Sequence, residues 1–215
     1  MIYPTIILDN FFNDPIKIVQ FANSLEYYQD DKGKWPGKRT KELHEINRSF
    51  FENYGSKILS ILYPTIKEKS FNCSLYFQKI SKEYTNKGWI HKDDTFDFTT
   101  IVYLSQHKEC GTSLFDSKNI SNEILNYENK KNMYLKKNFK KEMKYLNENN
   151  SQFIETIKIN SKFNRLIMFD GAQHHAAQKF IENNIEEERL TLIGFFSNIY
   201  FQGIKFNGIE HKRII

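Results

Sequence analysis

Three short stretches of the sequence carry side chains that could hold a metal ion and an anion. The first is His91-Lys92-Asp93, an imidazole and a carboxylate two positions apart. The second runs from Asn164 to His175 and reads Asn-Arg-Leu-Ile-Met-Phe-Asp-Gly-Ala-Gln-His-His, an apolar segment followed by a turn and two adjacent histidines. The third is Arg189-Leu190-Thr191. Taken singly, each pattern is weak, because exposed polar pairs and half-buried histidines are common in folded proteins.

The spacing within the first stretch suggests how its two side chains could meet. Side chains alternate across a β-strand, so residues two apart face the same side. A strand beginning near His91 would point this imidazole and the Asp93 carboxylate into one cavity, and Asp94 would face away. The competing interpretation is an exposed polar pair, which arises by chance in a chain with six histidines.

The same parity places Arg189 and Thr191 on one face of another strand. A buried guanidinium is unfavourable unless an anion meets it. Charge-assisted contacts to a carboxylate, about 1.5–3 kcal/mol each, would offset that penalty. The alternative is that Arg189 faces solvent and pairs with one of the preceding acidic residues, Glu186, Glu187 or Glu188.

Two histidines and one carboxylate form a ligand set that suits iron(II) and leaves coordination positions open. The order His-x-Asp, then His about eighty residues later, then Arg-x-Thr resembles the iron(II)/2-oxoglutarate dioxygenase superfamily, and within it the prolyl-hydroxylase-like branch. Two further segments are similar to strands of that family, namely Thr100-Ile-Val-Tyr-Leu104 and Cys110-Gly-Thr-Ser-Leu-Phe115. The resemblance covers about residues 70 to 200.

The resemblance implies a fold, an activity and a role for each residue. The fold would be a double-stranded β-helix, or jelly roll, with Fe(II) held by His91, Asp93 and His175. Arg189 and Thr191 would bind the distal carboxylate of 2-oxoglutarate, the co-substrate. Tyr103, one strand over and of suitable polarity, is a candidate donor to 2-oxoglutarate, and the alternative is a core tyrosine. With O2, such a dioxygenase hydroxylates an unactivated C–H bond of a peptide, an amino acid or a small metabolite.

Two details also depend on the resemblance. Parity does not decide between His174 and His175, because a turn precedes both. In similar sequences the ligand follows the Asp-Gly turn by the distance of His175 and precedes small residues, here Ala176-Ala177. The presence of Asp93 favours hydroxylation over halogenation, which in related enzymes accompanies loss of this carboxylate.

Two other functions fit part of the pattern. Two histidines and a carboxylate could hold catalytic zinc for hydrolysis, although the Arg-x-Thr pair has no role in that chemistry. A non-catalytic jelly-roll binding module would keep these residues without turnover. Binding of metal and 2-oxoglutarate separates the three hypotheses.

The elements that must position these residues follow from periodicity. Residues 6–12 predict a short strand, and apolar spacing predicts helices over 15–27 and 47–62. Short runs rich in β-branched and aromatic residues predict strands over 74–80, 98–104, 113–115, 153–159, 165–169 and 189–196. Strands without regularly alternating helices favour a sandwich or jelly roll.

The expected organisation is a single domain over 1–215, mainly β with flanking helices (α+β). It comprises a helical N-terminal support (1–70), a jelly-roll core (71–200) with a helical insertion at about 118–150, and a C-terminal tail (201–215). Residues 30–41 predict a surface loop. Its Trp35, Lys38 and Arg39, together with the lysine-rich insertion, could shape an entrance for an anionic or peptide substrate or simply be solvated.

Composition excludes several classes of protein. Of the net charge of +5, most lies between Lys118 and Asn150, a segment with eight lysines and four glutamates. The basic charge lacks interleaved aromatics at strand positions, which argues against a nucleic-acid partner. Two cysteines, Cys73 and Cys110, form no zinc or disulfide pattern, which indicates a reducing cytoplasm. Neither a signal peptide nor a membrane span is predicted.

Overall fold

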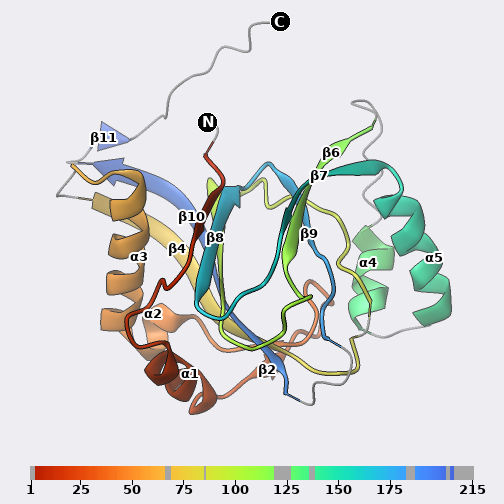
Figure 1. Cartoon of the computed structure of the whole chain (residues 1–215), viewed down its shortest axis with the longest axis horizontal. Helices are drawn as coiled ribbons and strands as arrows, with labels where there is room; N and C mark the ends of the chain where they lie inside the picture. Colours follow the sequence, from red (N-terminus) through yellow and green to blue (C-terminus); the bar gives the residue numbers. More distant parts are fainter. Residues whose placement is uncertain are drawn as a thin grey trace, which may run out of the picture.

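The computed structural model describes residues 3–65, 69–84, 86–118, 127–135, 139–182, 187–201 and 204–205. Two antiparallel sheets form its centre, and helices lie outside both (Figure 1). Over the described residues the larger sheet has the strand order β1-β8-β5-β10-β4-β3-β2, with β11 paired to β10, and the smaller has the order β7-β6-β9.

Most of the predicted strands form within two residues of their expected bounds, and the runs at 74–80 and 189–196 extend further. The strand predicted over 6–12 ends at Leu8, and the strands at 28–29, 38–39, 174–177 and 204–205 were not predicted. The larger sheet comprises β1 (Ile6–Leu8), β2 (Tyr28–Gln29), β3 (Lys38–Arg39), β4 (Lys69–Ile80), β5 (Phe98–Tyr103), β8 (Arg165–Asp170), β10 (Arg189–Phe201) and β11 (Ile204–Lys205). The smaller comprises β6 (Thr112–Ser117), β7 (Phe153–Ile159) and β9 (His174–Ala177).

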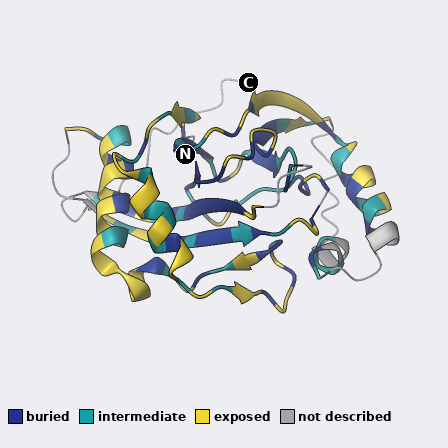
Figure 2. Ribbon diagram, turned by 60° about the horizontal axis from the view of Figure 1, so that its bottom comes forward, coloured by how far each residue is buried: buried dark blue, intermediate teal, exposed yellow. Residues whose placement is uncertain are grey.

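The two faces of the larger sheet differ in chemistry. On the outer face, Leu75, Val102 and Leu192 pack against α3 (Arg48–Leu62) and α1 (Pro15–Asn23) in the main apolar core. Burying each such side chain contributes about 1.5–3 kcal/mol. The inner face faces a cavity, and Figure 2 shows buried strands between helices whose outer surfaces are exposed. Strand alternation therefore separates a stabilising face from a face free to carry polar groups.

Capping explains where the N-terminal helices begin. Asp14 accepts a hydrogen bond from the Lys17 backbone, with Pro15 as the first helical residue, and Asn47 accepts from the Phe50 backbone. The helix predicted over 15–27 ends at Asn23, four residues early. There the Ser24 hydroxyl donates to the Phe21 carbonyl (2.8 Å), a local bond that competes with continuation of the helix.

Several predictions on organisation need correction or extension. The N-terminal 70 residues are not only helical, because β1, β2 and β3 lie there beside α1, α2 (Leu43–Ile46) and α3. The insertion is helical where it is described, in α4 (Tyr127–Tyr134) and α5 (Phe139–Asn150). Most of the predicted tail lies outside the described residues. No helix of the described chain is long and apolar enough to cross a membrane.

Asp9 fixes the N-terminal strand to β8. Its carboxylate accepts from Arg165 (Nε–Oδ1 2.6 Å) and from Lys162 (Nζ–Oδ2 2.8 Å), and hydrogen bonds from these two cations lower the pKa of Asp9. We expect Asp9→Asn to lower the free energy of unfolding by up to about 1 kcal/mol at neutral pH, measured by urea denaturation.

The lowered pKa of Asp9 also predicts how the stability difference between wild type and Asp9→Asn changes with pH. A carboxyl whose pKa is depressed on folding contributes stability above its unfolded value, here 3.8, and loses it as the pH falls further. The difference between wild type and Asp9→Asn should therefore shrink below about pH 3.8. A difference that stays constant down to pH 2 would contradict the assignment.

Candidate functional site

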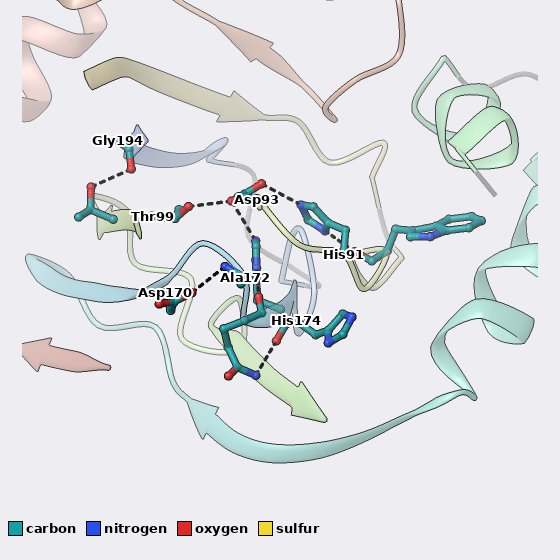
Figure 3. Close-up of polar contacts among 11 residues, drawn as sticks. His91, Asp93, Thr99, Asp170, Ala172, His174 and Gly194 are labelled. Carbon is teal, nitrogen blue, oxygen red and sulfur yellow. Dashed lines mark hydrogen bonds and ion pairs between the residues drawn. The ribbon is translucent and has the colours of Figure 1, made fainter. Parts of the chain in front are cut away.

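His91, Asp93 and His175 come together at one end of the cavity. Their potential ligand atoms all lie within 4.8 Å of one another. The Asp93 carboxylate lies between the two rings, 3.8 Å from His91 Nε2 and 3.4 Å from His175 Nε2 (Figure 3). Across the described residues no other group of three histidine, cysteine or acidic side chains meets this condition.

The backbone sets the separation of the two histidines. The His91 N–H donates to the His175 carbonyl (3.1 Å), and the His175 N–H donates to the His91 carbonyl (2.9 Å). Asp93 is held in turn by a backbone bond to Gly171 (2.8 Å). A side chain at Gly171 would meet the Phe96 carbonyl at 2.1 Å, so this close approach requires glycine.

The prediction that strand alternation brings His91 and Asp93 together was wrong in its geometry. His91 forms a single isolated bridge to His175, and Asp93 lies in an irregular segment directly before the turn at Asp94 and Thr95. The carboxylate reaches the rings because its backbone is tied to Gly171 rather than because a ladder continues.

Hydrogen bonds at the far sides of the rings orient both imidazoles. His91 Nδ1 lies 2.7 Å from the Trp89 carbonyl, and His175 Nδ1 lies 3.0 Å from the Gln173 carbonyl. A carbonyl can only accept, so each Nδ1 carries the proton and each Nε2 presents its lone pair toward Asp93. This is the arrangement in which histidines bind metals.

The protonation states also suit metal ligands. Burial, and then the positive charge of Lys130, hold the pKa of His91 well below its usual value. Burial opposes ionisation of Asp93, but His175 and Thr99 stabilise the carboxylate enough to bring its pKa below the usual value. A neutral His91 imidazole and an ionised Asp93 carboxylate are the forms that bind a cation.

Thr99 on β5 positions the carboxylate by donating its hydroxyl to Asp93 Oδ2 (2.8 Å; Figure 3). We expect Thr99→Val to weaken Ni(II) binding, measured by calorimetry, by about 10-fold to 100-fold, the usual effect of removing a bond to a ligating group. Thr99→Ser keeps the hydroxyl and should bind nearly as the wild type does. Equal weakening by both substitutions would show that packing, not the hydrogen bond, matters.

The two adjacent histidines have different surroundings. The His174 ring packs on Phe153, with 4.7 Å between ring centroids, whereas the His175 ring lies 4.5 Å from the His91 ring. His175 lines the cavity. The structure thus brings His175, and not His174, to the cluster.

Arg189 and Thr191 lie in the same cavity. Thr191 pairs in register with Tyr103 of β5 and Gln78 of β4, so all three side chains share the inner face. Arg189 is 5% exposed. Its Nε and the Thr191 hydroxyl have no hydrogen-bond partner among the described residues. The interpretation of Arg189 as a solvent-facing residue is therefore wrong, while Glu187 and Glu188 are exposed.

Tyr103 is buried, and its hydroxyl donates to the Thr112 hydroxyl (2.9 Å). Thr112 lines the cavity, and the Arg189 guanidinium lies 5.8 Å from the centre of the Tyr103 ring. Tyr103 thus stands beside the guanidinium, and donation by its hydroxyl to a bound co-substrate stays a prediction.

The cavity joins these groups and measures about 570 Å³, within the range of small-molecule sites. Its lining residues include Trp35, Arg39, Lys130 and Tyr134, which come from two segments to which the sequence assigned at most the role of an entrance. Burial lowers the pKa of Arg39 to about 10 and that of Lys130 to about 8. Residues 30–41 were predicted as a surface loop, yet they form part of the cavity wall.

A family model matches residues 3–196, almost the whole described chain, and its description is "Family of unknown function (DUF6445)". The chain belongs to this family. No curated protein matches this DUF6445 member.

Solved structures share the fold of this DUF6445 chain. HygX from Streptomyces hygroscopicus, determined with nickel and 2-oxoglutarate bound, has a TM-score of 0.57 at 12% identity over 90% of this chain and 82% of its own. EvdO2 from Micromonospora carbonacea var. aurantiaca has a TM-score of 0.56 at 10% identity over 94% and 89%. An oxidoreductase of the 2OG-Fe(II) oxygenase family from Burkholderia pseudomallei has a TM-score of 0.52 at 10% identity over 90% and 85%. At such identities these likenesses establish a common fold.

Proposed function

We propose that this protein is an iron(II)- and 2-oxoglutarate-dependent dioxygenase. The observation that carries the proposal is one cavity holding both a His-Asp-His cluster and a buried arginine without an acidic partner among the described residues. The first suits iron(II), and the second suits the free carboxylate of a dicarboxylate co-substrate.

The topology supports a double-stranded β-helix. Along the chain the strands alternate between the sheets: β4 lies in the larger, His91 bridges to the smaller, β5 returns to the larger, and β6 and β7 lie in the smaller. β8, β9 and β10 continue this alternation. Antiparallel strands that alternate between two facing sheets are typical of a jelly roll.

The residues present fit the implied groups. His91 Nε2, His175 Nε2 and an Asp93 oxygen would hold the iron from one side and leave the cavity side open. The Arg189 guanidinium, with the Thr191 hydroxyl, would orient the distal carboxylate of 2-oxoglutarate. When bound, iron and 2-oxoglutarate supply oxidative decarboxylation by O2 coupled to hydroxylation of a C–H bond.

The same residues explain why other functions are less well supported. A zinc hydrolase would use the cluster but would give no role to the buried Arg189 and Thr191. A non-catalytic binding module would not require both imidazoles to present Nε2 toward one carboxylate. The proposed reaction, hydroxylation of an organic substrate, uses both features.

Anaerobic titration of iron(II) and 2-oxoglutarate into the metal-free protein tests this proposal. We expect a weak visible charge-transfer band that needs both components, as the co-substrate chelates iron through its keto and carboxylate oxygens. Its absence in folded protein, shown by circular dichroism, would overturn the proposal. Zinc binding without any effect of 2-oxoglutarate on thermal stability would favour a zinc site instead.

A further inference from the structure

We propose that the cavity contains a second anion-binding subsite, formed by Arg39 and Lys130, and that the substrate is a small molecule bearing a carboxylate or phosphate group. This inference rests on the proposed function, in which Arg189 is already occupied by 2-oxoglutarate. It names the class of molecule that would occupy the rest of the cavity.

The sheet directs Arg39 into the cavity. Arg39 on β3 pairs with Gln78 on β4, and Gln78 pairs with Thr191 on β10. Residues directly opposite in antiparallel strands share a face, so the three side chains form one row across the inner face. Lys38, the preceding residue, faces the other way and is exposed.

Aromatic rings hold the Arg39 guanidinium. Its central carbon lies 4.4 Å from the centre of the Trp35 ring, 5.5 Å from that of Tyr76 and 5.6 Å from that of Phe195. Its Nε is buried and makes no hydrogen bond within the described part of the chain. A guanidinium stacked by its flat face keeps the N–H groups at its edge for a planar anion.

Lys130 brings a second positive charge to the same cavity from another segment of the chain. It lies on α4, beside Tyr134, and both residues line the same cavity as Arg39. The helix and the segment that carries Trp35 are in close contact, since a side chain at Gly33 would lie 2.4 Å from the Lys131 carbonyl oxygen. Two segments that cover the cavity thus each contribute one cation.

The charges of the cavity lining indicate that an anionic ligand is needed to balance them. Its described lining has five positive side chains, Lys34, Arg39, Lys92, Lys130 and Arg189, against one carboxylate, Asp93. Bound 2-oxoglutarate would place one carboxylate on the metal and the other on Arg189. Asp93 and the buried Asp30 act on Arg39 only from a distance, and neither Arg39 nor Lys130 forms an ion pair with a described residue. A partly buried cation gains most from an anion in direct contact.

The remaining walls suit an apolar body attached to that anion. Trp35, Trp89, Tyr134 and Phe195 line the cavity, and aromatic faces pack well against flat or apolar groups. A small molecule with one anionic end and an apolar or aromatic body satisfies both the charge and the walls.

The protein's own fluorescence can test the subsite. Its two tryptophans, Trp35 and Trp89, both line the cavity. Phenylacetate, phenyl phosphate and uncharged phenylacetamide would be titrated into protein loaded with Ni(II) and 2-oxoglutarate, in buffer without other multivalent anions. We expect quenching by at least one of the two anions, with phenylacetamide at least about tenfold weaker. The stronger anion decides between carboxylate and phosphate.

Variants separate the subsite from the co-substrate site. Arg39→Gln and Lys130→Gln should each weaken binding of the preferred anion about tenfold or more while leaving the affinity for 2-oxoglutarate unchanged. Lys38→Gln, on the same strand but exposed, should change neither. Circular dichroism and 2-oxoglutarate binding report whether each variant is folded.

Several outcomes would overturn the inference. Wild-type protein that binds 2-oxoglutarate, but that neither phenylacetate nor phenyl phosphate quenches more strongly than phenylacetamide does, has no anion subsite. Loss of 2-oxoglutarate binding in Arg39→Gln would make Arg39 a co-substrate ligand instead. Failure of wild-type protein to bind 2-oxoglutarate at all would refute the proposed function. The anion subsite would then stand only if metal-free wild-type protein binds one of the two anions more tightly than phenylacetamide and Arg39→Gln does not.

Discussion

Asp93→Ala should abolish binding of iron(II) and Ni(II). The carboxylate is the only charged member of the cluster, and without it two neutral imidazoles would have to hold a divalent cation alone. Loss of a bond merely to a ligating group weakens metal binding about 10-fold to 100-fold, so loss of the ligand should exceed about 100-fold. Calorimetric titration under anaerobic conditions measures the affinity directly.

Asp94→Ala is the matched control for this prediction. Asp94 is the next residue, carries the same charge and is exposed. The Asp94→Ala variant should bind metal as the wild type does. Metal should therefore raise the melting temperature of Asp94→Ala but not that of Asp93→Ala. If Asp93→Ala keeps an affinity within tenfold of the wild type, the metal does not bind where we propose.

Arg189→Gln should have opposite effects on co-substrate binding and on stability. Truncating one partner of a buried charge pair costs about 2–5 kcal/mol, so affinity for 2-oxoglutarate should fall by about 30-fold or more. In the ligand-free protein, however, Arg189 is a buried cation without an acidic partner among the described residues, and its removal should leave the melting temperature unchanged or higher.

Arg165→Gln gives the reverse pattern and serves as the control. Arg165 lies on β8, where its guanidinium pairs with Asp9 rather than facing the cavity. This variant should lower the melting temperature and leave 2-oxoglutarate binding unchanged. If Arg189→Gln instead lowered stability and kept 2-oxoglutarate affinity, Arg189 would be a structural residue.

The local sequence pattern predicted most of the strands, because each of them consists of a short run of residues typical of β-strands. β5, β7 and β8 consist of β-branched and aromatic runs bounded by polar residues, and the structure confirms them within two residues. α3 was likewise predicted from its regular apolar stripe. The early end of α1 depends on one hydroxyl bond at Ser24, which periodicity does not reveal.

Site residues could be predicted where their types and spacing match a known set of metal ligands, and not elsewhere. His91, Asp93 and His175 were proposed from their order, and they do lie together. Arg39 and Lys130 lie among other lysines in polar segments, so nothing in their neighbours distinguishes them from solvated charges. Only the pairing of β3 with β4 and the packing of α4 over the cavity bring them inward.

The pairing of β4 with β10 has a consequence for biosynthesis. β10 lies at the centre of the larger sheet, between β4 and β5, yet it begins more than a hundred residues after β4 ends. While the chain emerges from the ribosome, β4 and β5 have no common neighbour until Arg189 and the residues after it have appeared. The edges of β4 and β5 that β10 covers must therefore stay unpaired until β10 has been made, although β4 can already pair with β3 and β5 with β8. Folding should be slow and dependent on chaperones when β10 is delayed.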